Sequence, residues 1–156
     1  MTAKIPELLK SEHKELHGGL VRATRAGGKT GERAKALEKL LHQHFAKEEE
    51  FALPPIGLIA ALAQDEVNPK MRSVLPMTDR LKAELPTMLR EHKAIVTMLK
   101  KLTATAKREK KPEHADFAEK LMLHAKMEEK VLYPCVMLIG KYLSLTLGRE
   151  QFEGYC

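Results

Sequence analysis

The chain has 156 residues, a hydrophobic fraction of 44% and two well-separated cysteines, so we expect one domain with a real core and neither a disulfide framework nor a thiolate metal site. The net charge of +6 is spread along the chain and there is no tryptophan, so we expect no nucleic-acid partner. A charged, amphipathic N-terminus and the lack of an apolar run of about 18 residues predict a cytoplasmic protein without a membrane partner.

The expected elements are helices, because apolar residues recur at steps of three and four and no stretch alternates with a period of two. The first helix is expected at about 6–26, ended by Gly27 and Gly28, and the second at about 31–51. The third is expected to end near residue 107, with Pro86 either opening it or kinking a longer helix. The fourth is expected at about 112–133, stopped by Pro134. The apolar stretches 55–63 and 136–147 are expected to form short additional helices that cover the metal-binding end of the bundle.

The two halves of the chain repeat the same polar motifs at an offset of about 80 residues. Glu-His-Lys at 12–14 recurs at 91–93, and HxxxEE at 44–49 recurs at 124–129. Each half reads as a helical hairpin. The repeat therefore predicts an all-α, antiparallel four-helix bundle, with residues 1–156 forming a single domain.

Each long helix is expected to place one histidine in its apolar stripe, facing the core of the bundle. These histidines are His13, His44, His92 and His124. In each hairpin the two histidines are nearly equidistant from the turn, so antiparallel helices bring them to one level. A single inward histidine is more often a hydrogen-bonded core residue than a ligand. Four of them beside the inward carboxylates of Glu48 and Glu128 favour a metal site, since buried carboxylates are costly unless paired or metal-bound.

The HxxxE spacing places a histidine and a glutamate on one helix face, so each hairpin can offer a terminal imidazole and a bridging carboxylate. Nitrogen and oxygen ligands without sulfur suit iron or manganese, and six converging groups exceed the needs of a four-ligand zinc site. The chain contains no ExxH motif, which argues against a ferritin-type centre. The adjacent Glu49 and Glu129 are expected to be solvated or to contact the ligands from outside.

The order EHK, HxxxEE, EHK, HxxxEE, covering about residues 5–135, resembles the hemerythrin-like, HHE cation-binding family. The resemblance implies two non-haem iron ions joined by an oxo or hydroxo bridge. The ligands that it implies are His13, His44, Glu48, His92, His124 and Glu128. Oxygen-carrying hemerythrins have a second histidine one turn after the one on the third helix, where this chain has Val96. His17, one turn beyond His13, is a candidate fifth imidazole.

The expected function is that of a di-iron protein whose partner is a small-molecule oxidant, such as dioxygen, nitric oxide or peroxide, in a sensor, store or scavenger. One alternative is iron handling or iron-sulfur cluster repair, and another is a metal-free helical interaction module. The sequence leaves open catalytic turnover, the oligomeric state and the downstream partner. The remaining histidines, His42 and His114, are not expected to reach the cluster.

Overall fold

The computed structural model describes residues 3–148, and this part of the chain is helical, without strands. The α-helices are α1 (Glu7–Thr24), α2 (Gly28–Lys47), α3 (Ile59–Leu62), α4 (Leu75–Arg108), α5 (Pro112–Met127) and α6 (Tyr133–Leu147). Two π-helices, η1 (Glu48–Ala52) and η4 (Glu128–Leu132), and two 3-10 helices, η2 (Pro54–Leu58) and η3 (Pro69–Val74), lie between them.

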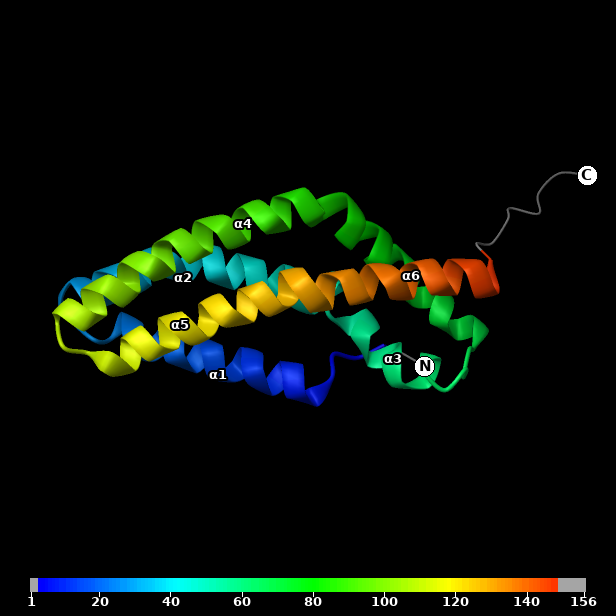
Figure 1. Cartoon of the computed structure of the whole chain (residues 1–156), viewed down its shortest axis with the longest axis horizontal. Coiled ribbons are helices and arrows are strands. Elements are labelled where there is room, and N and C mark those ends of the chain that lie inside the picture. The colour runs from blue at the N-terminus through cyan, green and yellow to red at the C-terminus, as the bar shows by residue number, and fades with distance from the viewer. Residues whose placement is uncertain (1–2, 149–156) are drawn as a thin grey trace, which may run out of the picture.

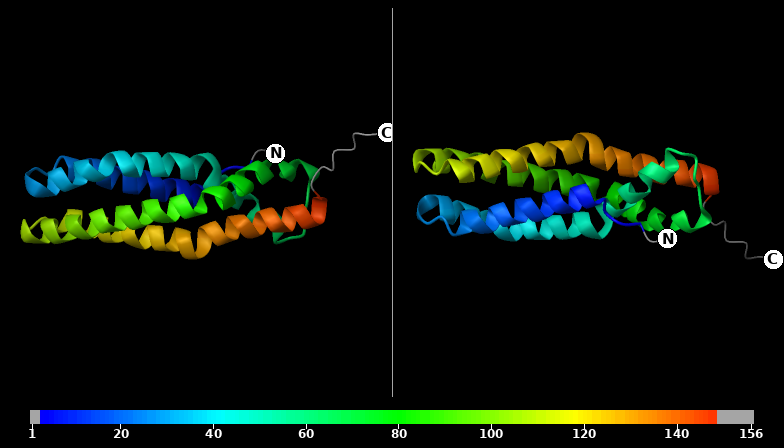
Figure 2. Two further views of the ribbon diagram at one scale, coloured as in Figure 1. Left: turned by 90° about the horizontal axis from the view of Figure 1, so that it is seen from above. Right: turned by 90° about the horizontal axis from the view of Figure 1, so that it is seen from below.

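Four helices run side by side and confirm the predicted all-α four-helix bundle (Figures 1 and 2). Around the bundle, α2 lies between α1 and α4, and α5 lies between α4 and α1. The turns α1–α2 and α4–α5 meet at one end of the molecule, while α3, α6 and the start of α4 extend the other end (Figure 1).

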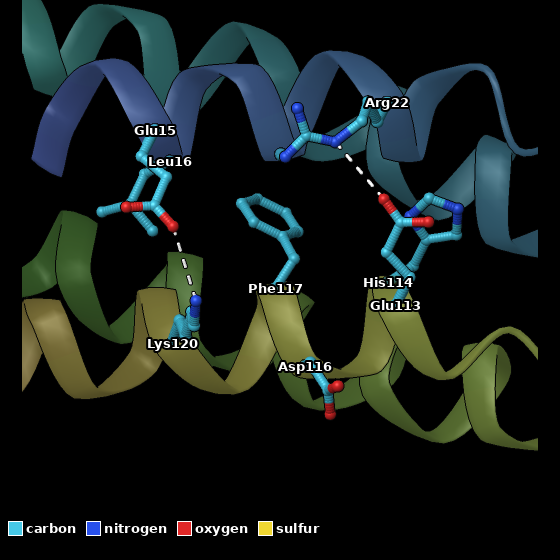
Figure 3. Close-up of a pocket in the computed structure, with 9 residues that line it drawn as sticks. Glu15, Leu16, Arg22, Glu113, His114, Asp116, Phe117 and Lys120 are labelled. Atoms are coloured by element: carbon cyan, nitrogen blue, oxygen red, sulfur yellow. Dashed lines mark hydrogen bonds and ion pairs between the residues drawn. The ribbon is translucent and has the colours of Figure 1, made fainter.

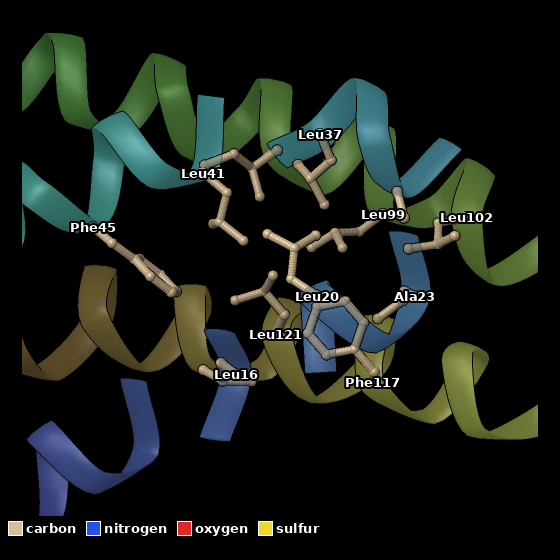
Figure 4. Close-up of a cluster of buried hydrophobic side chains, with 13 residues drawn as sticks. Leu16, Leu20, Ala23, Leu37, Leu41, Phe45, Leu99, Leu102, Phe117 and Leu121 are labelled. Carbon is tan, nitrogen blue, oxygen red and sulfur yellow. The ribbon is translucent and has the colours of Figure 1, made fainter. Parts of the chain in front are cut away.

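The core of the bundle forms where the apolar faces of the four helices pack against one another (Figure 4). Each helix contributes a leucine that is at most 1% exposed: Leu20, Leu37, Leu99 and Leu121. Full burial of one such side chain stabilises the fold by about 1.5–3 kcal/mol. This core occupies the part of the bundle nearest the hairpin turns, so the polar residues of the repeated motifs are held just beyond it.

The first hairpin turns where the sequence predicts. Gly27 and Gly28 have φ angles of 70° and 58°, a left-handed conformation that glycine adopts without steric cost. The helix α1 therefore ends at Thr24 and α2 starts at Gly28, three residues earlier than expected.

The prediction that Pro134 stops the fourth helix is wrong. The helical chain continues from α5 through η4 into α6, and Pro134 lies in the first turn of α6. The preceding π-helix explains this, because the N–H of Tyr133 donates to the carbonyl of Glu128, five residues back. Pro134 follows this wider turn directly, at a place where the regular pattern of helical hydrogen bonds is already interrupted, so the helical chain continues past it.

The structure of α4 decides between the two predictions for Pro86, which were that it opens the helix or lies inside a longer one. This proline lies inside α4, a single helix of 34 residues, so it does not open the helix. The ribbon of α4 bends along its length (Figure 1), as expected for an internal proline. The bend lets the first half of α4 pack on α6 while the second half belongs to the bundle.

The two additional apolar stretches pack on each other beyond the bundle core. Ile56 from η2 and Val136 from α6 share one buried cluster with Phe51 and Tyr133. A second cluster, around Leu58 and Leu143, fills the tip of this extension. The continuous stretch Pro112–Leu147 also contains an 18-residue window apolar enough, by length and composition, to cross a membrane. Of this window 28% is buried in the structure, and one such helix is weak evidence for a membrane span.

Candidate metal centre

Six buried side chains converge between the bundle core and the apolar extension. They form two groups whose ligand atoms lie within 4.8 Å of one another. Site A consists of His13, His124, Glu48 and Glu128, and site B consists of His44, His92, Glu48 and Glu128. Each of the six is at most 3% exposed. The structure therefore brings together all six residues named from the motifs, with the two glutamates shared between the sites.

Every histidine directs its Nε2 atom at a shared carboxylate. The distances to Glu48 are 3.0 Å from His44 and 3.4 Å from His13, and those to Glu128 are 3.3 Å from His124 and 3.5 Å from His92. Ligand atoms that bind one metal at about 2.1 Å in octahedral geometry lie about 3 Å apart. The spacing of these nitrogens and oxygens thus suits atoms of one coordination shell.

The two shared glutamates begin the two π-helices of the described chain. Each π-turn closes with a bond across five residues, from the Leu53 N–H to the Glu48 carbonyl at 2.8 Å and from the Tyr133 N–H to the Glu128 carbonyl. Single π-turns inside helices are frequent at functional sites. The sequence analysis missed these segments, although a proline six residues after each of the two glutamates was a shared signal.

Each of the four histidines also places its Nδ1 atom against a glutamate from a different helical element. The pairs and their Nδ1 to carboxylate distances are Glu12–His124 2.7 Å, Glu129–His92 3.0 Å, Glu91–His44 3.1 Å and Glu49–His13 3.5 Å. A carboxylate at Nδ1 holds a proton there and leaves the Nε2 lone pair free for a metal. Glu49 and Glu129 thus contact His13 and His92 from outside the cluster, as predicted. The same role of Glu12 and Glu91 was missed, although both open the repeated EHK motif.

The electrostatics of the cluster favour cations. Burial by itself would lower the pKa of His92, but hydrogen bonds with Glu128 and Glu48 outweigh burial and raise this pKa to about 10. The same balance, with Glu128 and Glu12 as partners, raises the pKa of His124 to about 9. The histidines in turn hold the pKa of Glu128 well below its usual value, against the effect of burial. Protons on the imidazoles therefore balance the carboxylates until a metal cation replaces them.

Two carboxylate oxygens and two imidazole nitrogens at the centre fit a metal in particular. The Oε2 atoms of Glu48 and Glu128 are buried and have no hydrogen-bond partner. Unpartnered buried carboxylate oxygens are costly, and each belongs to a residue that both sites share. In site A the Nε2 atoms of His13 and His124 face each other at 3.2 Å, so a proton or a metal ion must separate their lone pairs. The donor set of imidazoles and carboxylates suits iron or manganese.

His17 is not brought into either site. Its side chain is exposed, and its ring stacks on that of His42 with centroids 4.8 Å apart. The ring of Phe45 stacks on His13 at 4.3 Å on this side of the cluster. His17 and His42 line a surface groove that reaches His13 and Glu49.

The other leftover histidine, His114, lies away from the cluster. It lines a pocket between α1 and α5, where Phe117 projects between the helices (Figure 3). The ion pair Arg22–Glu113, with 3.3 Å between Nε and Oε1, closes one side of this pocket. His114 thus lies outside both groups, as its distance along the helix from His124 predicts.

Tyr133 is a further polar residue at the centre, which the sequence analysis treated as a helix end. It is fully buried, and its hydroxyl donates to Glu48 Oε1 at 2.5 Å. The same oxygen lies 3.2 Å from His92 Nε2 and 3.4 Å from His44 Nε2. Burial and the nearby carboxylates raise the pKa of Tyr133, so without a metal the phenol keeps its proton.

A comparison with protein families finds one match that covers most of the chain. The family model for the hemerythrin HHE cation binding domain matches residues 4–136. This range contains both repeats of the EHK and HxxxEE motifs and all six residues of sites A and B. Neither a search of curated proteins nor a search of solved structures finds a significant match.

Proposed function

This chain belongs to the hemerythrin HHE cation-binding family, and on that basis we propose that it holds two non-haem iron ions and uses them to bind or react with a small oxidant. His13 and His124 would hold one ion in site A, and His44 and His92 the other in site B. Glu48 and Glu128 would bridge the two ions. Bound iron supplies an exchangeable coordination position and a change of oxidation state, which dioxygen, nitric oxide or peroxide can use.

The observation that carries this proposal is the sharing of two carboxylates between two pairs of histidines. A single ion would use one pair and leave the other pair of buried imidazoles without a metal. The two oxygens without a hydrogen bond, Glu48 Oε2 and Glu128 Oε2, are the atoms that a second contact from each carboxylate would satisfy; both face His13 Nε2, at 3.4 Å and 3.7 Å. The geometry therefore supports two ions better than one.

The surrounding protein supports reaction with a small molecule. The apolar bundle core lies on one side of the cluster, and the cluster of Phe51, Ile56 and Val136 lies on the other, so bulk water is kept out. Two surface grooves nevertheless reach site A, one lined by His13 and the other by His124. A small oxidant has a short path to this side of the centre. We propose that the protein acts in the cytoplasm as a sensor, store or scavenger of such a molecule.

Metal analysis tests the first step. Protein purified without chelator should contain about two iron atoms per chain, and the reduced protein should change its optical spectrum when mixed with dioxygen, nitric oxide or peroxide. A well-loaded preparation with one zinc and no iron would contradict the proposal, and a full load of manganese would reassign the metal. The oxidant that reacts fastest in stopped-flow mixing identifies the partner.

Matched histidine variants test the assignment of ligands. His44→Ala and His124→Ala should each lose most of the bound iron, because each removes a buried ligand of one site. His42→Ala and His114→Ala should keep it, because neither ring reaches the cluster. Equal losses in all four variants would mean that iron binds elsewhere.

A further inference from the structure

The hydroxyl of Tyr133 is directed at site B. Its oxygen lies 2.5–3.4 Å from Glu48 Oε1, His92 Nε2 and His44 Nε2, which are three atoms expected to bind the same ion. The ring is held in this position, because it is fully buried and stacks on the imidazole of His92 with centroids 5.5 Å apart and planes at 20°. Tyr133 therefore points a fixed oxygen at the metal side of these ligands.

The position of the Tyr133 oxygen relative to the imidazole nitrogens differs from that of the carboxylates that only hydrogen-bond to the histidines. A supporting carboxylate such as Glu91 touches the Nδ1 atom of His44, on the side of the ring away from the cluster. The Tyr133 oxygen instead lies beside the Nε2 atoms, at spacings close to the distance of about 3 Å between neighbouring corners of an octahedron around a metal. This is the position that a further ligand atom of site B would take.

The internal repeat shows that this feature belongs to one half only. Tyr133 follows the second π-turn, and the residue in the equivalent position after the first π-turn is Leu53. Leu53 is also buried, but its side chain is hydrocarbon and offers no ligand atom. The repeat thus supplies both sites with two histidines and the shared carboxylates, and adds a phenol to one of them.

We propose that Tyr133 binds the iron of site B as a phenolate, so that the two irons are chemically inequivalent. This inference rests on the proposed di-iron function. On metal binding the phenol proton leaves to solvent and its oxygen exchanges the hydrogen bond to Glu48 for a bond to iron. Tyrosine serves as an iron ligand in other proteins. Site B then has one protein ligand more than site A, and the grooves at His13 and His124 lead to the site with the vacant position.

A phenolate bound to iron(III) gives a ligand-to-metal charge-transfer band in visible light, and this provides the test. The oxidised, iron-loaded protein should show the band, and resonance Raman excitation within it should enhance tyrosine ring modes. Growth on ring-deuterated tyrosine should shift those modes in the unaltered chain, so this measurement does not depend on a variant that folds. Tyr133→Phe should lose the band while keeping about two irons, because the other six ligands are unchanged. Tyr142→Phe, a change on the same helix α6 away from the cluster, should keep it.

The outcomes separate this inference from the proposed function. A protein with two irons per chain whose charge-transfer band is missing, or survives in Tyr133→Phe, would overturn the phenolate ligand and leave the di-iron function standing. A chain that takes up no iron would overturn both. Azide, an exogenous anion, should still bind to Tyr133→Phe, since the inference places its position in site A. Loss of azide binding in this variant together with retained iron would mean that Tyr133 itself takes part in holding the anion, and would contradict the assignment of that position to site A.

Discussion

The hydrogen bond between Glu91 and His44 is expected to keep the proton of this imidazole on Nδ1 and so to strengthen metal binding, and this can be tested directly. Glu91 is 14% exposed and accepts a hydrogen bond from His44 Nδ1 at 3.1 Å while also pairing with Lys47. Burial would raise the pKa of Glu91, but these two partners lower it, so the carboxylate is ionised at neutral pH. In Glu91→Ala the imidazole loses the group that keeps its proton on Nδ1. The ring can then carry the proton on Nε2, where it cannot bind metal.

The size of the effect follows from the position of Glu91 outside the ligand shell. Loss of a carboxylate behind a metal-bound histidine typically weakens metal binding about 10- to 100-fold. That range corresponds to about 1.4–2.7 kcal/mol of binding free energy. Because His44 belongs to site B, the weakened ion is the one in site B, and the affinity of site A should change less.

The matched control is Glu84→Ala, which removes another glutamate of α4 that faces Lys47, at 3.9 Å, but touches no histidine. Iron release would be followed during titration of each variant with a competing chelator. We expect Glu91→Ala to release about one iron per chain at a chelator concentration roughly 10- to 100-fold below that for the unaltered protein. Glu84→Ala should follow the unaltered protein. Identical release curves for the two variants would refute the role given to the Glu91 carboxylate.

Three further predictions concern stability. Gly18→Ala should raise Tm by roughly 2–4 °C, because alanine favours a helix by about 1 kcal/mol relative to glycine. Gly19→Ala should lower Tm, because its Cβ would lie 2.5 Å from the ring of Phe117. Thermal unfolding curves in which both variants shift Tm in the same direction would contradict this packing. Hydrogen bonds from the hydroxyl and N–H of Thr30 lower the pKa of Glu109 from 4.5 to about 2, so the stabilisation by this carboxylate is complete above pH 4.5 and is lost as the pH falls toward 2. In urea unfolding, Glu109→Gln should therefore lose less stability over that pH range than the unaltered protein. Parallel losses of stability in the two proteins would argue against this role of Glu109. Removal of iron by reductant and chelator should lower Tm by several degrees, since a ligand at 100 times its Kd adds about 2.7 kcal/mol, and an unchanged Tm would mean that iron does not bind the folded centre.

The sequence by itself determined the helical bundle and the members of the cluster. Apolar residues spaced three and four apart define the buried face of each helix. The repeat sets how far along that face, counted from the turn, the histidines lie, and these are His13, His44, His92 and His124. These features are local, because helix period and distance from the turn depend on nearby residues alone. The structure accordingly buries the four histidines with Glu48 and Glu128 in two groups.

Only the tertiary structure decided what surrounds those six residues. The partner of each Nδ1 atom comes from another helical element, as with Glu12 and His124, so the pairing depends on how the helices are rotated against each other. The π-turns that begin at Glu48 and Glu128 also carry no strong local signal. The helical chain continues past Pro134 after the second one, and the hydroxyl of Tyr133 comes to lie 2.5 Å from Glu48 Oε1. The position of His17 was likewise decided by the tertiary structure, which keeps this residue out of the cluster. Its spacing allows a ligand, but the packing of Phe45 on His13 leaves it at the surface.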